Sequence, residues 1–386
     1  MELRAVVACL VAFAVAAAVT PIVGRAARRI GAVDMLKDRG LAREPTPLLG
    51  GLAIFAGALV AALALLPGTP RTHAILAGAA VITVVGAVDD VYDLRPAGKL
   101  AGQSAAALVL VLNDVTVQSF TLPFLHRVDL GSFGGPVTLA GLVLLMNVVN
   151  FSDGVDGLAA GVCAISSAAF AVIAFDLGRN SAAILAALIC GAALGFLLHN
   201  FHPASVFMGD CGSNLLGLLL GAVIVEGTLK TNALIALIGP LVVLAVPFLD
   251  TGFVIAKRIK YRRPIYRGDS NHFHHRFHRI GFSQRRSVLY LYAWTLIMAG
   301  DAVALRFVPY SYSSGRLRPG WAALMAFLLM IGLAASAYLV YVLEILKLRR
   351  LRAWQLRRAD PDTTEHDIDE QVEREMETGE FRQVRT

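Results

Sequence analysis

The sequence predicts an all-α, polytopic integral membrane protein with about 11 transmembrane helices. Three observations lead to this prediction. Hydrophobic residues make up 56% of the 386 residues, and the mean hydropathy is +0.64. Only 16% of the residues are charged, against about a quarter in ordinary soluble domains. A bilayer span takes about 20 apolar residues, so the composition is sufficient for about ten or eleven spans.

Eleven apolar segments follow one another along the chain. They are residues 5–24, 48–66, 74–88, 100–112, 136–149, 157–175, 181–198, 212–225, 233–256, 288–305 and 320–346. The fourth and fifth are short for a span, so they are tilted, partly re-entrant or extended by their flanks. In the first segment the basic cluster of Arg25, Arg28 and Arg29 follows the apolar run. A secretory signal carries its charge in front, so we interpret this segment as a retained helix.

The positions of lysine and arginine predict the orientation of these segments. With eleven spans and the N-terminus outside, 27 of the 35 basic residues fall on the cytoplasmic side. Cytoplasmic loops of membrane proteins carry such an excess. The net charge of +7 is therefore explained by topology, and the sequence predicts a cytoplasmic C-terminus and no nucleic-acid partner.

Two regions differ sharply in composition. Residues 1–358 are predicted to form the integral membrane domain, which ends in a basic stretch suited to an anionic leaflet. Residues 359–386 carry ten acidic residues and three arginines, with almost nothing apolar. This composition is typical of a disordered, solvated cytoplasmic tail.

Outside the tail, acidic side chains gather at the predicted cytoplasmic ends of three segments. These residues are Asp89, Asp90 and Asp93 after the third segment, Asp153 and Asp156 with Asn150 after the fifth, and Asp210 before the eighth. Asp89 and Asp93 are four residues apart, which predicts one helical face, where like charges repel unless a cation or a substrate lies among them. Hard oxygen ligands without cysteine favour Mg²⁺, or alternatively Mn²⁺.

Basic residues accompany these acids. Lys99 lies in the same predicted cytoplasmic stretch as Asp89. The loop between the ninth and tenth segments contains ten basic residues and the cluster His272, His274, His275 and His278, which flanks Arg276. A zinc site is one interpretation of the histidines, but a phosphate-binding role fits the acidic turns better. The lysines and arginines of this loop also fit a purely topological role.

Six motifs stand in order between about residues 45 and 290. They are PTPLLGG (45–51), DDVYD (89–93), KLAGQ (99–103), NVVNFSDGVDGLA (147–159), FMGDCGSN (207–214) and NHFHHRFHRIG (271–281). Together they resemble the polyprenyl-phosphate N-acetylhexosamine-1-phosphate transferase family. The third aspartate of DDVYD and the HFHHRF pattern are more similar to the branch that uses UDP-N-acetylglucosamine than to the branch that uses UDP-N-acetylmuramoyl-pentapeptide.

The resemblance implies an activity and its setting. It implies Mg²⁺-dependent transfer of a sugar 1-phosphate from a UDP-N-acetylhexosamine to undecaprenyl phosphate, with release of UMP. The reaction would take place on the cytoplasmic face of the bacterial inner membrane, as the first membrane step of cell-wall or surface-glycan synthesis. The expected partners are these two substrates and the lipid bilayer, and a homodimer is left open.

The resemblance also implies roles for individual residues. The expected metal ligands are Asp210 and Asn150, and the expected catalytic residues are Asp89, Asp90, Asp153 and Asp156. The expected substrate-binding residues are Asp93, Lys99, Asn147, His272, His274, His275 and Arg276. Asp89 or Asp90 would be the general base, although a phosphate monoester with a second pKa near ~6 is already mostly dianionic at neutral pH. A covalent aspartyl-phosphate route remains an alternative.

An ion-coupled secondary transporter is the competing class of protein. Transporters hold ionisable residues near the middle of the bilayer and often contain inverted repeats. The acids a transporter would need, Glu226, Asp250 and Asp301, are scattered, and we find no internal repeat. The sequence therefore favours the enzyme.

Overall fold

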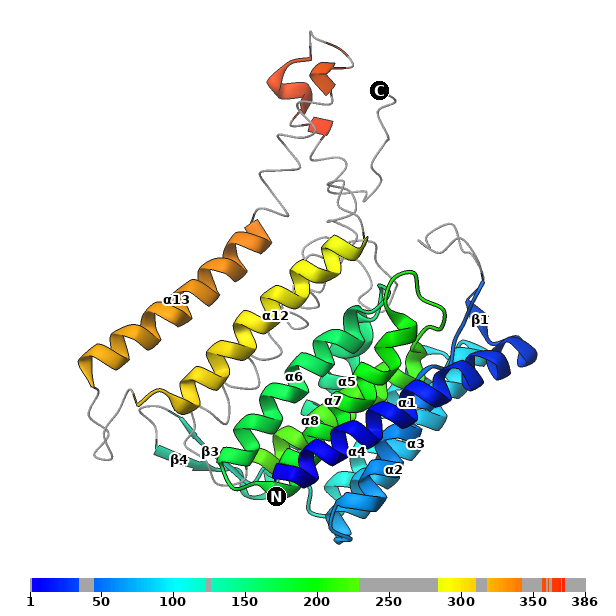
Figure 1. Ribbon diagram of the computed structural model, residues 1–386. Coiled ribbons are helices and arrows are strands. Elements are labelled where there is room, and N and C mark those ends of the chain that lie inside the picture. Colours follow the sequence, from blue (N-terminus) through cyan, green and yellow to red (C-terminus); the bar gives the residue numbers. More distant parts are fainter. Residues whose placement is uncertain are drawn as a thin grey trace.

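The computed structural model describes residues 2–34, 45–122, 126–228, 284–309 and 318–341, and short pieces between 356 and 371. The longer helices are α1 (Glu2–Ile30), α2 (Gly51–Leu65), α3 (Pro70–Tyr92), α4 (Pro96–Val111), α5 (Gly134–Ser152), α6 (Leu158–Asp176), α7 (Asn180–Asn200), α8 (Gly209–Thr228), α12 (Gln284–Phe307) and α13 (Pro319–Tyr341). They pack side by side as a bundle (Figure 1). The predicted all-α class is therefore confirmed for most of the described chain.

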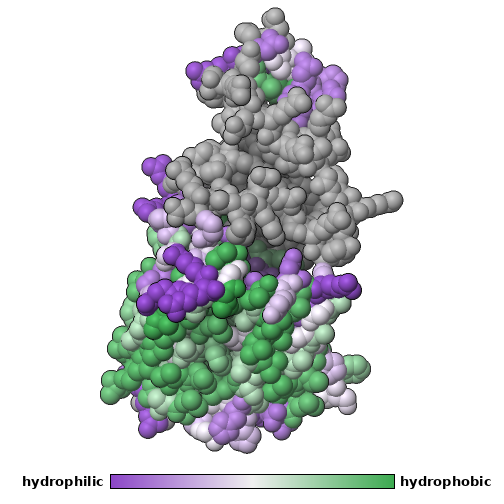
Figure 2. All heavy atoms as spheres, turned by 90° about the vertical axis from the view of Figure 1, so that its right-hand side faces the viewer, coloured by the Kyte–Doolittle hydropathy of each residue, from purple (hydrophilic) through white to green (hydrophobic). Residues whose placement is uncertain are grey.

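Seven of the described helices are long and apolar enough to cross a membrane, namely α1, α3, α5, α6, α7, α8 and α12. On the face shown in Figure 2, apolar side chains cover the body of the protein, with hydrophilic side chains above and below them. Each predicted segment except one coincides with a described helix, although α2 and α4 are shorter than a typical span. The exception, residues 233–256, lies outside the described residues, so the count of eleven stays a prediction.

Two short hairpins depart from the all-helical prediction. Strands β1 (Val33–Asp34) and β2 (Thr46–Pro47) pair antiparallel near the C-terminal end of α1. Strands β3 (Ser119–Leu122) and β4 (His126–Asp129) pair antiparallel between α4 and α5, before the 3₁₀ turn η1 (Gly131–Phe133). Strands of two to four residues are too short to show the alternating pattern on which a sequence-based prediction depends.

The centre of the bundle is formed by α7 and α8, which are the most buried of the candidate spans. Helix α1 packs closely along α7 at two glycines of α7. A Cβ added at Gly191 would overlap the Cys9 carbonyl of α1, and one added at Gly195 would overlap the Phe13 carbonyl. Small residues at such positions allow two helix backbones to approach closely in a membrane.

Successive helices run in opposite directions, so one end of the bundle collects the C-terminal ends of α3, α5 and α7 and the N-terminal ends of α4, α6 and α8. Glycines allow the close approach of these ends. A Cβ at Gly86 of α3 would overlap the backbone of Cys211 in α8, and a Cβ at Gly51 of α2 would overlap Gly212. The acidic residues that the sequence places at helix ends therefore meet at one end of the molecule.

The last predicted region is only partly described. Residues 365–368 form a helical turn, and most of residues 359–386 lie outside the described residues. The division at residue 358 and the disordered tail both stay predictions.

Candidate active site

Asp90, at the end of α3, caps the first turn of α8. Its Oδ1 accepts a hydrogen bond of 2.6 Å from the backbone N–H of Asp210, and its Oδ2 accepts one of 3.2 Å from the N–H of Cys211. The first N–H groups of a helix have no partner within the helix and attract negative charge. Gly209 has φ +71°, and a Cβ there would overlap the Asp90 carboxylate. Asp90 thus fixes the position of Asp210.

Lys99, in the first turn of α4, lies at the centre of the acidic cluster. Its ammonium forms ion pairs with the Asp210 carboxylate and with Asp89 Oδ2, the latter at 3.2 Å. Lys99 Nζ also lies 3.4 Å from Asn150 Oδ1. The Asp89 side chain is only 8% exposed, so these charges interact where water screens them poorly.

Asn150, near the end of α5, links this cluster to α8. Its Nδ2 donates hydrogen bonds to Asp210 Oδ1 and to Ser213 Oγ, the latter at 2.9 Å. Its Oδ1 faces Lys99, so the two ends of the amide match the charges beside them. Four elements therefore contribute to one site, because α3, α4, α5 and α8 hold Asp89, Lys99, Asn150 and Asp210 respectively.

A chain of amides lies next to the cluster and supports it. Asn147 Nδ2 donates to Gln103 Oε1 at 2.9 Å, and Gln103 Nε2 donates to Asn214 Oδ1 at 2.7 Å. Asn214 Nδ2 donates in turn to the Asp210 carbonyl at 2.8 Å. Gln103 and Asn214 are almost completely buried, so these bonds satisfy groups that would be costly to leave unpaired.

The sequence prediction gave no site role to Gln103, Ser213 or Asn214. Gln103 lies four residues after Lys99, and Ser213 and Asn214 lie three and four residues after Asp210. That spacing on a helix is the signal that could have identified them.

The turn between α5 and α6 holds the two other predicted catalytic aspartates. Asp156 Oδ2 accepts hydrogen bonds from His202 Nδ1 at 2.7 Å and from the Ala204 N–H at 3.1 Å. The next residue, Gly157, donates its N–H to Asn200 Oδ1 at 2.9 Å. The described contacts of Asp156 thus anchor the loop that leads from α7 to α8. The sequence prediction left His202 without a role.

Asp153 lies next to the cluster and is held at the C-terminal end of α5. Burial raises the pKa of Asp153 well above its usual range, and the carboxylates of Asp210 and Asp90 raise it further.

Asp93 does not lie beside Asp89 on one helical face as the spacing predicts. Helix α3 ends at Tyr92, and Asp93 follows as its left-handed cap with φ 51°. The Asp93 side chain is exposed, and none of the contacts described above for the acidic cluster involves it. The predicted substrate residues of the basic loop, His272, His274, His275 and Arg276, lie outside the described residues.

The donor set fits a divalent cation. Within the described residues, no three histidine, cysteine, aspartate or glutamate side chains are grouped as a metal site by themselves. However, two carboxylates, those of Asp89 and Asp210, flank the ammonium of Lys99, and a third, that of Asp90, accepts a hydrogen bond from the Asp210 N–H. The excess of negative charge and the oxygen ligands suit Mg²⁺, which takes one or two carboxylates and completes its shell with water and substrate phosphate.

Comparison with known proteins identifies relatives that match most of the chain. Residues 72–228, which run from α3 through α8, match the family described as Glycosyl transferase family 4. The chain is 38% identical over 306 residues to a probable undecaprenyl-phosphate N-acetylglucosaminyl 1-phosphate transferase of Bacillus subtilis, which covers 79% of this chain and 86% of the relative.

Two further relatives have names that state different activities. A decaprenyl-phosphate N-acetylglucosaminephosphotransferase of Mycobacterium leprae is 37% identical over 325 residues, covering 75% of this chain and 80% of the relative. A phospho-N-acetylmuramoyl-pentapeptide-transferase of Moorella thermoacetica is 33% identical over 293 residues, covering 70% and 89%.

These relatives cover the helices that hold the acidic cluster. The matched stretch includes Asp89, Lys99, Asn150 and Asp210, which the fold brings together at one end of the bundle. The chain therefore belongs to the polyprenyl-phosphate N-acetylhexosamine-1-phosphate transferase family, whose members are multi-pass membrane phosphotransferases.

Proposed function

We propose that the protein transfers N-acetylglucosamine 1-phosphate from UDP-N-acetylglucosamine to undecaprenyl phosphate and releases UMP. The observation that carries this proposal is the site itself, in which Lys99 is held between Asp89 and Asp210 with Asn150 beside them. The choice of sugar and lipid is supported by relatives whose names state an N-acetylglucosamine transfer to a polyprenyl phosphate.

In this reaction an oxygen of the lipid phosphate forms a bond to the sugar-linked phosphorus. The bond from that phosphorus to the bridging oxygen breaks, and UMP leaves with the electron pair. Two anions must therefore approach each other, so positioning and charge neutralisation dominate catalysis. A Mg²⁺ held by Asp210 and Asn150 would neutralise diphosphate charge.

The residues of the chain supply the remaining parts of the reaction. Lys99 is the cation that can meet the lipid phosphate, because its ammonium is partly exposed while its carboxylate partners hold it in place. Asp90 is bonded through both oxygens to α8, whereas Asp89 faces Lys99. Asp89 is therefore the better placed general base, although a dianionic lipid phosphate has little need of one.

The direct test uses the purified full chain in lipid nanodiscs with undecaprenyl phosphate and Mg²⁺. UMP and lipid product are measured with UDP-N-acetylglucosamine, other UDP-N-acetylhexosamines and UDP-N-acetylmuramoyl-pentapeptide. We expect product only with Mg²⁺ or Mn²⁺ present, the fastest turnover with UDP-N-acetylglucosamine, and regeneration of the UDP-sugar from lipid product and UMP.

Two results would contradict the proposal. Preferential use of the pentapeptide donor would assign the protein to the activity named for the Moorella relative. No turnover with any UDP-sugar, and no exchange of UMP, would reject the proposed reaction. The cytoplasmic placement of the site at the bacterial plasma membrane is part of the proposal and rests on the lysine and arginine distribution.

A further inference from the structure

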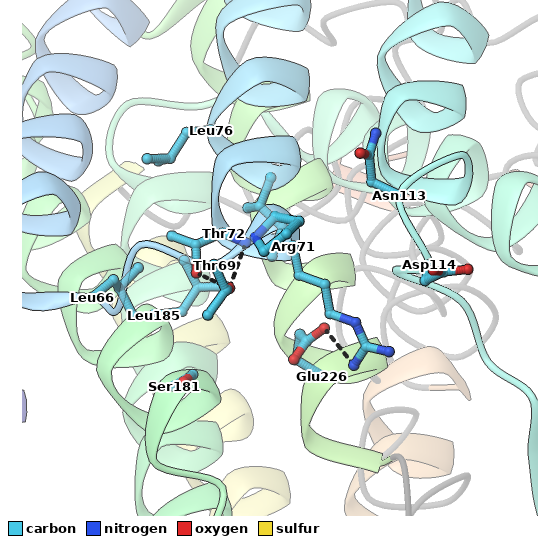
Figure 3. A pocket seen from close by; sticks show the side chains of 12 residues that line it. Leu66, Thr69, Arg71, Thr72, Leu76, Asn113, Asp114, Ser181, Leu185 and Glu226 are labelled. Atoms are coloured by element: carbon cyan, nitrogen blue, oxygen red, sulfur yellow. Dashed lines mark hydrogen bonds and ion pairs between the residues drawn. The ribbon is translucent and has the colours of Figure 1, made fainter.

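A cavity lies at the end of the bundle opposite the acidic cluster. Its volume is about 450 Å³, which is within the range of small-molecule sites. It is formed where α2 leads into α3, where α4 ends, where α7 begins and where α8 ends. Figure 3 shows that side chains from these elements surround one space.

The cavity contains one cation and two carboxylates. Arg71 of α3 and Glu226 of α8 point toward each other across the cavity, with 3.8 Å between Arg71 Nη1 and Glu226 Oε1 (Figure 3). Asp114, which follows α4, lines the same cavity. The pocket therefore presents both signs of charge, with an excess of one negative charge.

Glu226 is not satisfied by its surroundings. Its side chain is 17% exposed, and Oε1 is buried yet accepts no hydrogen bond within the described part of the chain. Arg71 is too far away to donate one, because 3.8 Å exceeds hydrogen-bonding distance. A buried carboxylate oxygen without a donor is costly, so a ligand that donates a hydrogen bond to Glu226 Oε1 would be favoured.

The rest of the lining combines hydroxyl groups with an apolar wall. The hydroxyls of Thr69 and Thr72 are 3.0 Å apart, and only one of their two protons is used between them. Leu66, Leu76 and Leu185 provide an apolar wall (Figure 3). The lining thus suits a ligand with a charged head and an apolar body.

We propose that this cavity binds the headgroup of a zwitterionic phospholipid that carries a primary ammonium, such as phosphatidylethanolamine. The ammonium would donate to Glu226 Oε1, the phosphodiester would meet Arg71 and the free threonine hydroxyl, and an acyl chain would lie along the leucines. An anionic headgroup without an ammonium fits less well, because it would leave Glu226 Oε1 without a donor. A quaternary ammonium has no N–H to donate.

The proposal does not depend on the reaction proposed above, because the cavity and the acidic cluster lie at opposite ends of the bundle. It is tested by binding rather than by turnover. The purified full chain in detergent is titrated with phosphatidylethanolamine, with phosphatidylcholine of the same acyl chains and with soluble glycerophosphoethanolamine, and native mass spectrometry measures bound ligand.

We expect phosphatidylethanolamine to bind at least about tenfold more tightly than phosphatidylcholine, the scale of one charge-assisted hydrogen bond. Glu226→Gln should remove that preference. Arg71→Gln should instead weaken the binding of both lipids, because the phosphodiester that Arg71 would meet is common to them. The matched control is Asp176→Asn, because Asp176 forms a 2.5 Å ion pair with Arg306 at the same end of the bundle but does not line the cavity. This control should bind phosphatidylethanolamine as the unchanged protein does.

Three results would overturn the proposal. One is equal affinity for the two lipids, and another is unchanged phosphatidylethanolamine binding in folded Glu226→Gln protein. Equal affinity for glycerophosphoethanolamine would reject the lipid in favour of a soluble amine. Thermal unfolding without lipid checks that each variant folds. If Glu226→Gln does not fold, Arg71→Gln provides an independent test.

Discussion

Lys99 acts as an internal counter-ion in the described structure. Its ammonium takes the place among Asp89, Asp210 and Asn150 that a bound cation would otherwise need to fill. Partly buried carboxylates at such short separations repel one another unless a positive charge lies between them. The site is therefore arranged around positive charge, which agrees with the proposed role of Lys99 toward the lipid phosphate.

Replacement of Asp210 tests the metal role. We expect Asp210→Asn to lower turnover by at least about 100-fold, the scale found when one preorganised electrostatic contact is lost. The side-chain volume barely changes. The hydrogen bond to the Asp90 side chain comes from the backbone N–H of Asp210 and is kept, so the thermal unfolding temperature should change little.

Asp129→Asn is the matched control for this substitution. Asp129 is an exposed carboxylate on β4, at the opposite end of the bundle, and its Oδ1 accepts a backbone N–H at 3.0 Å as an asparagine oxygen also could. Turnover should be unchanged in this control. Near-normal turnover of Asp210→Asn at saturating Mg²⁺ would instead remove Asp210 from the proposed coordination sphere.

Asp156 allows catalysis to be separated from anchoring. Its contacts with His202 and Ala204 hold the loop before α8, so Asp156→Ala should destabilise the fold by about 1–3 kcal/mol and reduce turnover. Asp156→Asn keeps an acceptor oxygen, and we expect it to lose less than about tenfold in turnover. The measurements are thermal unfolding and UMP release. A normally folded Asp156→Asn protein as inactive as Asp210→Asn would instead support the predicted catalytic role.

At this scale the sequence predicted which residues meet better than how they meet. The motifs located Asp89, Lys99, Asn150 and Asp210, and the structure brings them together. Spacing alone failed for Asp93, because the i to i+4 rule assumes a continuing helix and α3 ends one residue earlier. The histidine loop has not been tested, since it lies outside the described residues.

At the scale of elements, the site depends on how closely α3 and α8 approach. We expect Gly86→Ala to push the two helices apart, because the new methyl group would overlap the Cys211 backbone rather than a flexible side chain. Overpacking of this kind costs about 1–3 kcal/mol. It should also lower turnover, since Asp90 and Asp210 lie on opposite sides of this contact.

Gly141→Ala is the matched control, measured by the same unfolding and turnover assays. Gly141 lies in the middle of α5, and a Cβ there meets nothing within 4 Å. Alanine is also the better helix former, so stability should stay the same or rise. If Gly86→Ala matched this control in both assays, the contact between α3 and α8 would not position the site.

Hydropathy located the helices well and their ends poorly. The short predicted segment at 136–149 proved to be the core of α5, which extends from Gly134 to Ser152. Its polar C-terminal end includes Asn150, which the predicted segment excludes although the hydrogen bond of Asn150 to Ser213 satisfies it within the bundle. Tertiary partners of this kind cannot be read from one segment alone.

At the scale of the whole molecule, the acidic end of the bundle is predicted to face the cytoplasm. Two variants place one added cysteine at each end of the bundle. Arg29→Cys lies near the end of α1 on the acidic side, and Gly68→Cys lies between α2 and α3 at the opposite end. A membrane-impermeant thiol reagent added to intact cells should label position 68, and should label position 29 only after permeabilisation. The protein without either added cysteine gives the background, and the opposite labelling pattern would reverse the predicted topology.

The contact between α1 and α7 determines how the molecule responds to its solvent. Its attraction comes from the close fit of the α1 backbone at Cys9 and Phe13 against α7, where Gly191 and Gly195 leave room for the two carbonyls. Lipid tails are as apolar as the side chains at this contact, so exclusion of water contributes little to this attraction. Detergent tails resemble lipid tails in this respect. Extraction into a micelle therefore removes little of what holds α1 in place, whereas one added methyl group at Gly191 removes much of it.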